Sequence, residues 1–360
     1  MNISTGLGAS FTDDWHALAD YVAAAEQVGV DSIWSIETWT YDAVSPLGYL
    51  AARTERIKLG TGIMQIDART PAMVAMTANT LASMSGGRFI LGLGVSGPQV
   101  IEGWHGVPFA RPLQRTRETV EIIRKALSGE RLVYDGEIYH LPRPGGEGKA
   151  LSIGPRPANP VPIYLATLGP KNLELTGELA DGWIGTMFIP EHADNFFGHI
   201  AAGAARAGRS LADIDLGVGA GSVAFVADDA DMPRLLAARK PGLAFYIGAM
   251  GSAQSNFYND TWRRAGYTEM AREVQRLWLG GQRAEATALI PDDLAFKSNL
   301  IGTEDQVRER LRRYRAVGVN TLRISPEGAT PDARLATLER LVALVREVDA
   351  EAAPAASTAQ

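Results

Sequence analysis

Eight short apolar segments run along the chain, and nearly every one is followed by an amphipathic helical stretch. Short apolar runs that alternate with helices are typical of parallel strands buried on both faces. Eight such units favour a closed (β/α)8 barrel, an α/β TIM-barrel fold, over an open doubly wound sheet. The segments are residues 2–9, 31–37, 56–64, 88–95, 161–167, 181–188, 215–227 and 320–327.

The length of the chain leaves room for insertions, because such a barrel takes about 250 residues and this chain has 360. We predict one domain over residues 1–350, with insertions at about 130–160 and 240–300 and a disordered tail at 351–360. The first insertion carries a predicted hairpin, and the second carries two further helices and the glycine-rich, aromatic stretch "YIGAMGSAQSNFYND". That stretch is either a lid over the substrate or a subunit-packing segment.

Composition excludes several classes of protein. Basic and acidic residues are interspersed, with a net charge of −6, so neither nucleic acid nor an anionic membrane is expected as a partner. The absence of cysteine excludes disulfides and thiolate nucleophiles. No histidine–carboxylate pair has metal-ligand spacing, so no metal is predicted. No apolar run is long enough to span a bilayer, and no secretory signal opens the chain, so we expect a cytoplasmic protein.

One motif, "GLGVSG" at 92–97, matches G-x-G-x-x-G. A dinucleotide-binding Rossmann turn requires its third glycine to open a helix and an acidic residue to end the next strand about 20 residues later. Here Pro98 follows Gly97, residues 99–113 read as a loop, and Glu118 and Glu121 fall inside the next predicted helix. The motif therefore predicts a tight turn at a strand end, not a Rossmann site.

Glycines gather at the ends of three predicted strands, in Gly60-Thr-Gly62, Gly94–Gly97 and "TLGPKN" at 167–172. The carboxyl ends of barrel strands form the catalytic rim, and missing side chains let a flat ligand approach the backbone. The third stretch runs into a helix, whose first N–H groups form an anion site with Lys171 nearby. This combination suits a planar cofactor that bears a phosphate.

Several longer stretches resemble the luciferase-like flavin monooxygenase superfamily, and most closely its branch of oxidoreductases that use coenzyme F420, a 5-deazaflavin. They are "AEQVGVDSIWSIE", "LAARTERIKLGTGI", "RTPAMVAMTANTLASMSGGRFILGLGVSGPQVIEGWHGVPF", "RTRETVEIIRKAL", "PIYLATLGPKNLELTGELADGWI" and "GVNTLRI". The resemblance implies a bacterial luciferase-like barrel that holds the cofactor ring at its C-terminal rim. It also implies a cis peptide at Gly62-Ile63 and, often in this superfamily, a homodimer.

The resemblance also implies which residues contact F420, with flavin mononucleotide (FMN) as the alternative cofactor. They are Thr38, Gly62, Ile63, Gln65, Gly94, Val95, Ser96, Gly97, Thr167, Leu168, Gly169, Pro170 and Lys171. The sugar-phosphate dehydrogenases of the superfamily carry an Asp-His pair after strand two and a glutamate after strand four. This chain has Glu37-Thr38 and Gly97-Pro98 at those places, which argues against glucose-6-phosphate as a substrate.

Hydride transfer at carbon 5 of a deazaflavin also requires a proton donor or acceptor at the rim. Glu37 and His105 are the candidate catalytic residues, with Glu102 and Tyr41 after them. For Glu37 the alternative is a structural carboxylate paired with an arginine such as Arg69. For His105 the alternative is a histidine that orders its loop.

Three functions follow from these observations. The first is an F420-dependent oxidoreductase that acts on a C=C, C=N or carbonyl/alcohol group of a small molecule. The second is an FMN-dependent monooxygenase that uses reduced flavin and oxygen. The third is a non-catalytic barrel that only binds a cofactor.

Overall fold

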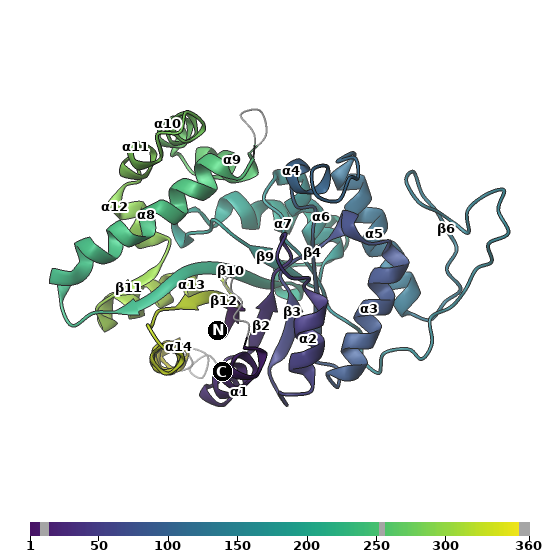
Figure 1. Ribbon diagram of the computed structural model, residues 1–360, viewed down its shortest axis with the longest axis horizontal. Helices are drawn as coiled ribbons and strands as arrows, with labels where there is room; N and C mark the ends of the chain where they lie inside the picture. The colour runs from purple at the N-terminus through teal and green to yellow at the C-terminus, as the bar shows by residue number, and fades with distance from the viewer. Residues whose placement is uncertain (8–13, 252–255, 353–360) are drawn as a thin grey trace, which may run out of the picture.

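Eight parallel strands close into a barrel in the computed structural model, which describes residues 1–7, 14–251 and 256–352 (Figure 1). The ring runs β1-β2-β3-β5-β8-β9-β10-β12, and pairing of β12 with β1 closes it. The predicted fold is therefore confirmed. The ring strands are β1 (Asn2–Gly6), β2 (Ser32–Ser35), β3 (Lys58–Thr61), β5 (Phe89–Gly94), β8 (Ile163–Leu165), β9 (Gly182–Gly185), β10 (Asp215–Phe225) and β12 (Thr321–Pro326).

Successive side chains of a strand point to opposite faces of the sheet. In this barrel they therefore enter two different apolar clusters. Ile163 and Leu165 pack into the large cluster beneath the outer helices. Tyr164, between them, joins Trp34, Ile90 and Ile184 in a small cluster inside the barrel. The outer helices are α1 (Trp15–Val28), α2 (Val44–Ala51), α3 (Pro71–Met84), α5 (Pro112–Leu127), α6 (Pro170–Leu179), α7 (Asp194–Arg206), α13 (Glu304–Ala316) and α14 (Pro331–Ala352).

A four-residue helix, α4 (Pro98–Ile101), directly follows Gly97. The sequence predicted a loop there, so that prediction was wrong at this point. Proline is well suited to the first position of a helix, and Pro98 occupies it here. The turn ends after these few residues, and the next outer helix, α5, begins only at Pro112.

The insertion at 130–160 carries a short hairpin, β6 (Tyr134–Asp135) and β7 (His140–Leu141), and extends away from the barrel beyond α3 and α5 (Figure 1). Glu118 of α5 is buried and ties this insertion to the barrel. Its carboxylate accepts hydrogen bonds from the backbone N–H groups of Glu137, Ile138 and Tyr139.

The second insertion contains more helix than the two helices predicted. Its elements are α8 (Met232–Ala249), α9 (Phe257–Arg264), α10 (Thr268–Leu279), α11 (Arg283–Ala288) and α12 (Asp292–Lys297), followed by an additional strand, β11 (Leu300–Gly302), beside β10. Pro241 lies inside α8. Because proline usually marks a helix boundary, the sequence did not show that a single helix continues on both sides of Pro241. Of the predicted lid stretch, residues 252–255 lie outside the described residues.

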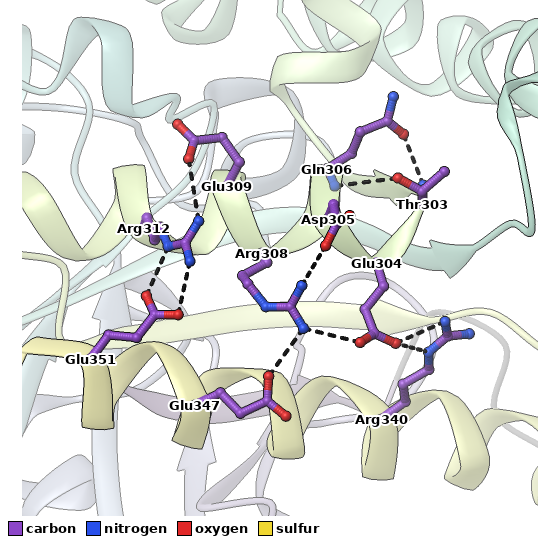
Figure 2. Close-up of polar contacts among 10 residues, drawn as sticks. All are labelled: Thr303, Glu304, Asp305, Gln306, Arg308, Glu309, Arg312, Arg340, Glu347 and Glu351. Atoms are coloured by element: carbon purple, nitrogen blue, oxygen red, sulfur yellow. Dashed lines mark hydrogen bonds and ion pairs between the residues drawn. The ribbon is translucent and has the colours of Figure 1, made fainter.

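The last helix, α14, ends at Ala352, so the first two residues of the predicted tail are helical. Residues 353–360 lie outside the described part of the chain. Ion pairs join α14 to α13 along the surface (Figure 2). Arg308 bonds to both Glu304 and Glu347, and Arg312 to Glu351.

No helix among the described residues has both the length and the apolar character needed to cross a membrane. The same part of the chain holds no group of three or more His, Cys, Asp or Glu side chains arranged to bind a metal ion.

Candidate functional site

Two neighbouring cavities open at the carboxyl ends of the barrel strands, and Thr186, just after β9, lines both. The first, about 490 Å³, lies over the ends of β5 and β8 and is here called the glycine-rich cavity. The second, about 550 Å³, lies over β10 and β12 beneath α8 and is called the arginine-lined cavity, after Arg239 and Arg323. Their position at the strand ends is the usual place for a barrel's active site.

The three glycines of "GLGVSG" have three different surroundings. A Cβ on Gly92 would lie 1.9 Å from the carbonyl oxygen of Thr61, so β3 and β5 approach too closely for any side chain. A Cβ on Gly94 would lie 3.1 Å from Ile63, on the wall of the cavity. Gly97 lines the cavity and precedes α4. Between them, Ser96 has a φ of 57°, a left-handed conformation that costs free energy for a residue with a side chain.

The N-terminus of α6 closes another side of the glycine-rich cavity. Gly169 is the N-cap residue and supplies no side-chain cap, so by helix geometry the backbone N–H groups of Lys171 and Asn172 have no partner within the helix. The side-chain Oδ1 of Asn172 is also buried and has no hydrogen-bond partner among the described residues, and Asn172 lines the cavity. These free polar groups beside a positive helix end suit a polar or anionic ligand group.

Glu37 occupies the end of β2 but is fully engaged by its neighbours. Its carboxylate accepts two hydrogen bonds from Arg69, at 2.7 and 2.8 Å, and others from the backbone N–H groups of Gln65 and Ala43. The hydrogen bonds to Glu37 raise the pKa of Arg69 further above its usual value. The structure therefore shows the pairing with Arg69 that the sequence left open as the alternative.

His105 reaches the same cluster through Gln65. The Gln65 amide nitrogen donates to the carbonyl oxygen of Glu37, so its oxygen faces His105. His105 Nε2 lies 2.8 Å from that oxygen and therefore donates the hydrogen bond. One chain of hydrogen bonds thus joins the loop after β5 to the ends of β2 and β3.

Comparison with known proteins identifies the family of this scaffold. The luciferase-like monooxygenase family matches residues 2–321, which cover most of the chain and seven of the eight barrel strands and end at the first residue of β12. The chain belongs to the luciferase-like monooxygenase family.

Relatives within this family include proteins that are named for coenzyme F420. The chain is 40% identical over 326 residues, 89% of its length and 93% of the relative's, to a putative coenzyme F420-dependent oxidoreductase of Mycobacterium tuberculosis. It is 30% identical to the 5,10-methylenetetrahydromethanopterin reductase of Methanolobus tindarius, over 85% of this chain and 88% of that one. The coenzyme F420-dependent tetrahydromethanopterin reductase of Methanopyrus kandleri shares the fold, with a TM-score of 0.73 at 24% identity over 94% of this chain and 98% of that one.

The luciferase-like resemblance had assigned thirteen residues to the cofactor, and the structure gathers most of them. Eight line the glycine-rich cavity: Ile63, Gly94, Val95, Ser96, Gly97, Thr167, Leu168 and Gly169. Gly62 lines the arginine-lined cavity, and the Gly62-Ile63 peptide bond is cis, as the resemblance implied.

The other assigned residues lie outside the linings of both cavities. Thr38 contacts Thr40, and Gln65 bridges Glu37 and His105. Lys171 is 77% exposed and pairs with Glu174 at 3.2 Å, because its side chain leaves the first turn of α6 on the solvent side. Pro170 opens that turn. Glu37 and His105 also lie outside both linings.

Sequence reasoning missed several lining residues of this luciferase-like site. Phe245 and Tyr258 come from the second insertion, whose path over the barrel has no sequence signal. Arg323 did carry one, because a charged residue stands between the apolar Leu322 and Ile324 of a predicted strand. An arginine within a buried barrel strand has to face the interior or the cavity above it.

Proposed function

We propose that this chain is a coenzyme F420-dependent oxidoreductase that transfers a hydride between carbon 5 of the deazaflavin and a small organic substrate. The observation that carries the proposal is the glycine-rich cavity on a luciferase-like barrel, in a chain 40% identical to a putative F420-dependent oxidoreductase.

The homodimer and the cytoplasmic location stay predictions. The three exposed methionines of α3, Met73, Met76 and Met84, are an apolar surface that supports the homodimer.

The residues present fit such a cofactor. Gly94 and Gly169 leave the cavity wall without side chains, and no atom of the described residues lies within 4 Å of where a Cβ on Gly169 would be. The unpartnered Asn172 Oδ1 and the first N–H groups of α6 would hold polar and phosphate groups of its tail. Ile63, between the two cavities, would support one face of the ring.

The bound deazaflavin supplies the hydride chemistry, and the protein supplies binding and orientation. The arginine-lined cavity then holds the substrate beside the ring, since the two cavities meet at Thr186. α8 lines one side of this cavity with Leu243 and Tyr246, which limits the access of water to the reacting atoms. We assign Glu37, Gln65 and His105 a positioning role, because their hydrogen bonds hold together the strand ends that support Ile63.

The test is anaerobic turnover of reduced F420 with a panel of enones, imines and ketones, followed by the return of the oxidised deazaflavin's absorbance. We expect at least one class to be reduced without oxygen. Oxygen uptake with reduced FMN, and no turnover of reduced F420, would instead assign the protein to the monooxygenases. Tight F420 binding with no turnover of any class, in either direction, would favour a non-catalytic barrel.

A further inference from the structure

We propose that Arg323 binds an oxyanion, a carboxylate or a phosphate, carried by the substrate, and that the substrate is an organic acid with an apolar carbon skeleton. This inference rests on the proposed function, because it names the substrate class for the cavity beside the cofactor. Arg323 lies on β12 and lines the arginine-lined cavity.

Arg323 lacks a counterion among the residues that the structure describes. Its one hydrogen bond goes from Nη2 to the carbonyl oxygen of Gly185, at 3.1 Å, although a guanidinium has five N–H donors. Of the described residues that line the cavity, two are arginines and none is an aspartate or a glutamate. Arg239, the other arginine, is already neutralised by an ion pair with Glu327.

The cavity leaves the Arg323 charge poorly solvated. Burial lowers the pKa of the guanidinium to about 10, so it stays protonated at neutral pH. A buried charge without a partner costs free energy, and an anion that enters the cavity recovers it. Two parallel hydrogen bonds from one guanidinium match a carboxylate or a phosphate.

The other walls of the cavity combine apolar side chains, with Trp34, Phe188, Leu243 and Trp262 among them, with glycines and polar side chains such as those of Ser222 and Asn299. A cavity of about 550 Å³ is large for an inorganic ion and suits a small organic molecule. One unpaired guanidinium beside these apolar side chains therefore favours an organic anion over an inorganic one. A neutral substrate of the same shape would leave the Arg323 charge uncompensated.

The cofactor is the other possible source of an oxyanion. The N-terminus of α6 and Asn172 offer an anion site in the glycine-rich cavity, whereas Arg323 lines only the other one. The negative charges of the cofactor tail and of the substrate would thus be bound at separate sites. The experiment has to show whether Arg323 binds the oxyanion of the substrate or that of the cofactor.

Binding of three aromatic probes tests the inference: benzoate, the neutral benzamide of nearly the same shape, and phenyl phosphate. Calorimetry at constant ionic strength measures their affinity with and without F420. We expect the better of the two anions to bind at least 10-fold more tightly than benzamide, and the ratio between the anions to show which oxyanion is preferred. Arg323→Met should abolish the preference, and Arg323→Lys should keep part of it because the charge remains. Arg272→Met, the same loss of charge on the exposed surface of α10, should leave it unchanged.

Equal binding of benzamide and both anions by the unaltered protein would overturn the inference, and this comparison needs no variant to fold. Unchanged anion preference in Arg323→Met would overturn it too. So would a 10-fold loss of F420 affinity in that variant with benzoate binding intact, because Arg323 would then serve the cofactor. A protein that prefers the anions but does not bind F420 would contradict the proposed function and leave the anion site standing.

Discussion

The carboxylate of Glu37 and the guanidinium of Arg69 meet through two parallel hydrogen bonds, of 2.7 and 2.8 Å. This pair fixes the end of β2 to the segment that follows β4 (Met64–Gln65). The Glu37 side chain is only 7% exposed, and Arg69 is its ion-pair partner. Because Ile63 directly precedes β4, the pair also fixes one wall of the glycine-rich cavity.

We expect Arg69→Met to lower the free energy of unfolding by about 2–3 kcal/mol, because it leaves a nearly buried carboxylate without its counterion. Urea denaturation measures the loss. The double variant Glu37→Gln/Arg69→Met is the control, since removing both charges should restore part of the stability. A loss below about 0.5 kcal/mol, typical of a surface pair, would contradict a positioning role for Arg69.

His105→Gln should weaken F420 binding about 5-fold, the effect of losing one hydrogen bond of about 1 kcal/mol, here the bond to Gln65. The pH dependence of turnover should stay unchanged, because His105 lies outside the linings of both cavities. Titration with F420 and a pH–rate profile measure the two effects. If the variant instead shows about 100-fold lower kcat, and its pH–rate profile no longer falls on one side, His105 is the proton donor that the sequence predicted.

Gly169→Phe should fill the glycine-rich cavity without disturbing the fold. Gly169 has an ordinary φ of −77° and open space where its Cβ would be. F420 affinity should fall at least 100-fold while the melting temperature stays within about 2 °C, which calorimetry and thermal denaturation measure. Gly198→Phe, at an equally open position on α7, should leave the affinity unchanged. Unaltered F420 binding by Gly169→Phe would place the cofactor elsewhere.

Glu118→Gln should release the insertion at 130–160, because an amide cannot accept all the backbone N–H groups that the carboxylate does. Burial raises the pKa of Glu118, but the hydrogen bonds from Gln114 and the backbone outweigh it, and the net pKa is lowered. The stabilisation is therefore complete above the ordinary pKa of glutamate, about 4.3, and is lost as the pH falls through the lower folded value.

Limited proteolysis of the insertion between pH 7 and pH 3 tests this prediction. In the unaltered protein, cleavage within 130–160 should rise below about pH 4. The Glu118→Gln variant should be cleaved readily at pH 7, with a loss of about 2 kcal/mol in stability. Glu147→Gln, at an exposed position in the same insertion, should behave like the unaltered protein. Resistance of Glu118→Gln at pH 7 would show that other contacts hold the insertion.

The sequence predicts the barrel because periodicity reports which faces are buried, as the opposite directions of Ile163 and Tyr164 show. It also predicts the glycine-rich rim. The sequence does not distinguish Gly92, where the backbone of Thr61 leaves no room for a side chain, from Gly94, which borders a cavity. Both are simply glycines of one motif. The partner of Glu37 was left open because strand position does not fix side-chain direction. The isolation of Arg323 from carboxylates depends on how α8 crosses the barrel, and nothing in its sequence specifies that path.

The most direct test of the central claim is an equilibrium titration of the purified protein with F420 and, separately, with FMN under the same conditions. We predict micromolar or tighter binding of F420 and binding of FMN at least 10-fold weaker. Tight binding of FMN, with no measurable binding of F420, would contradict the proposed function.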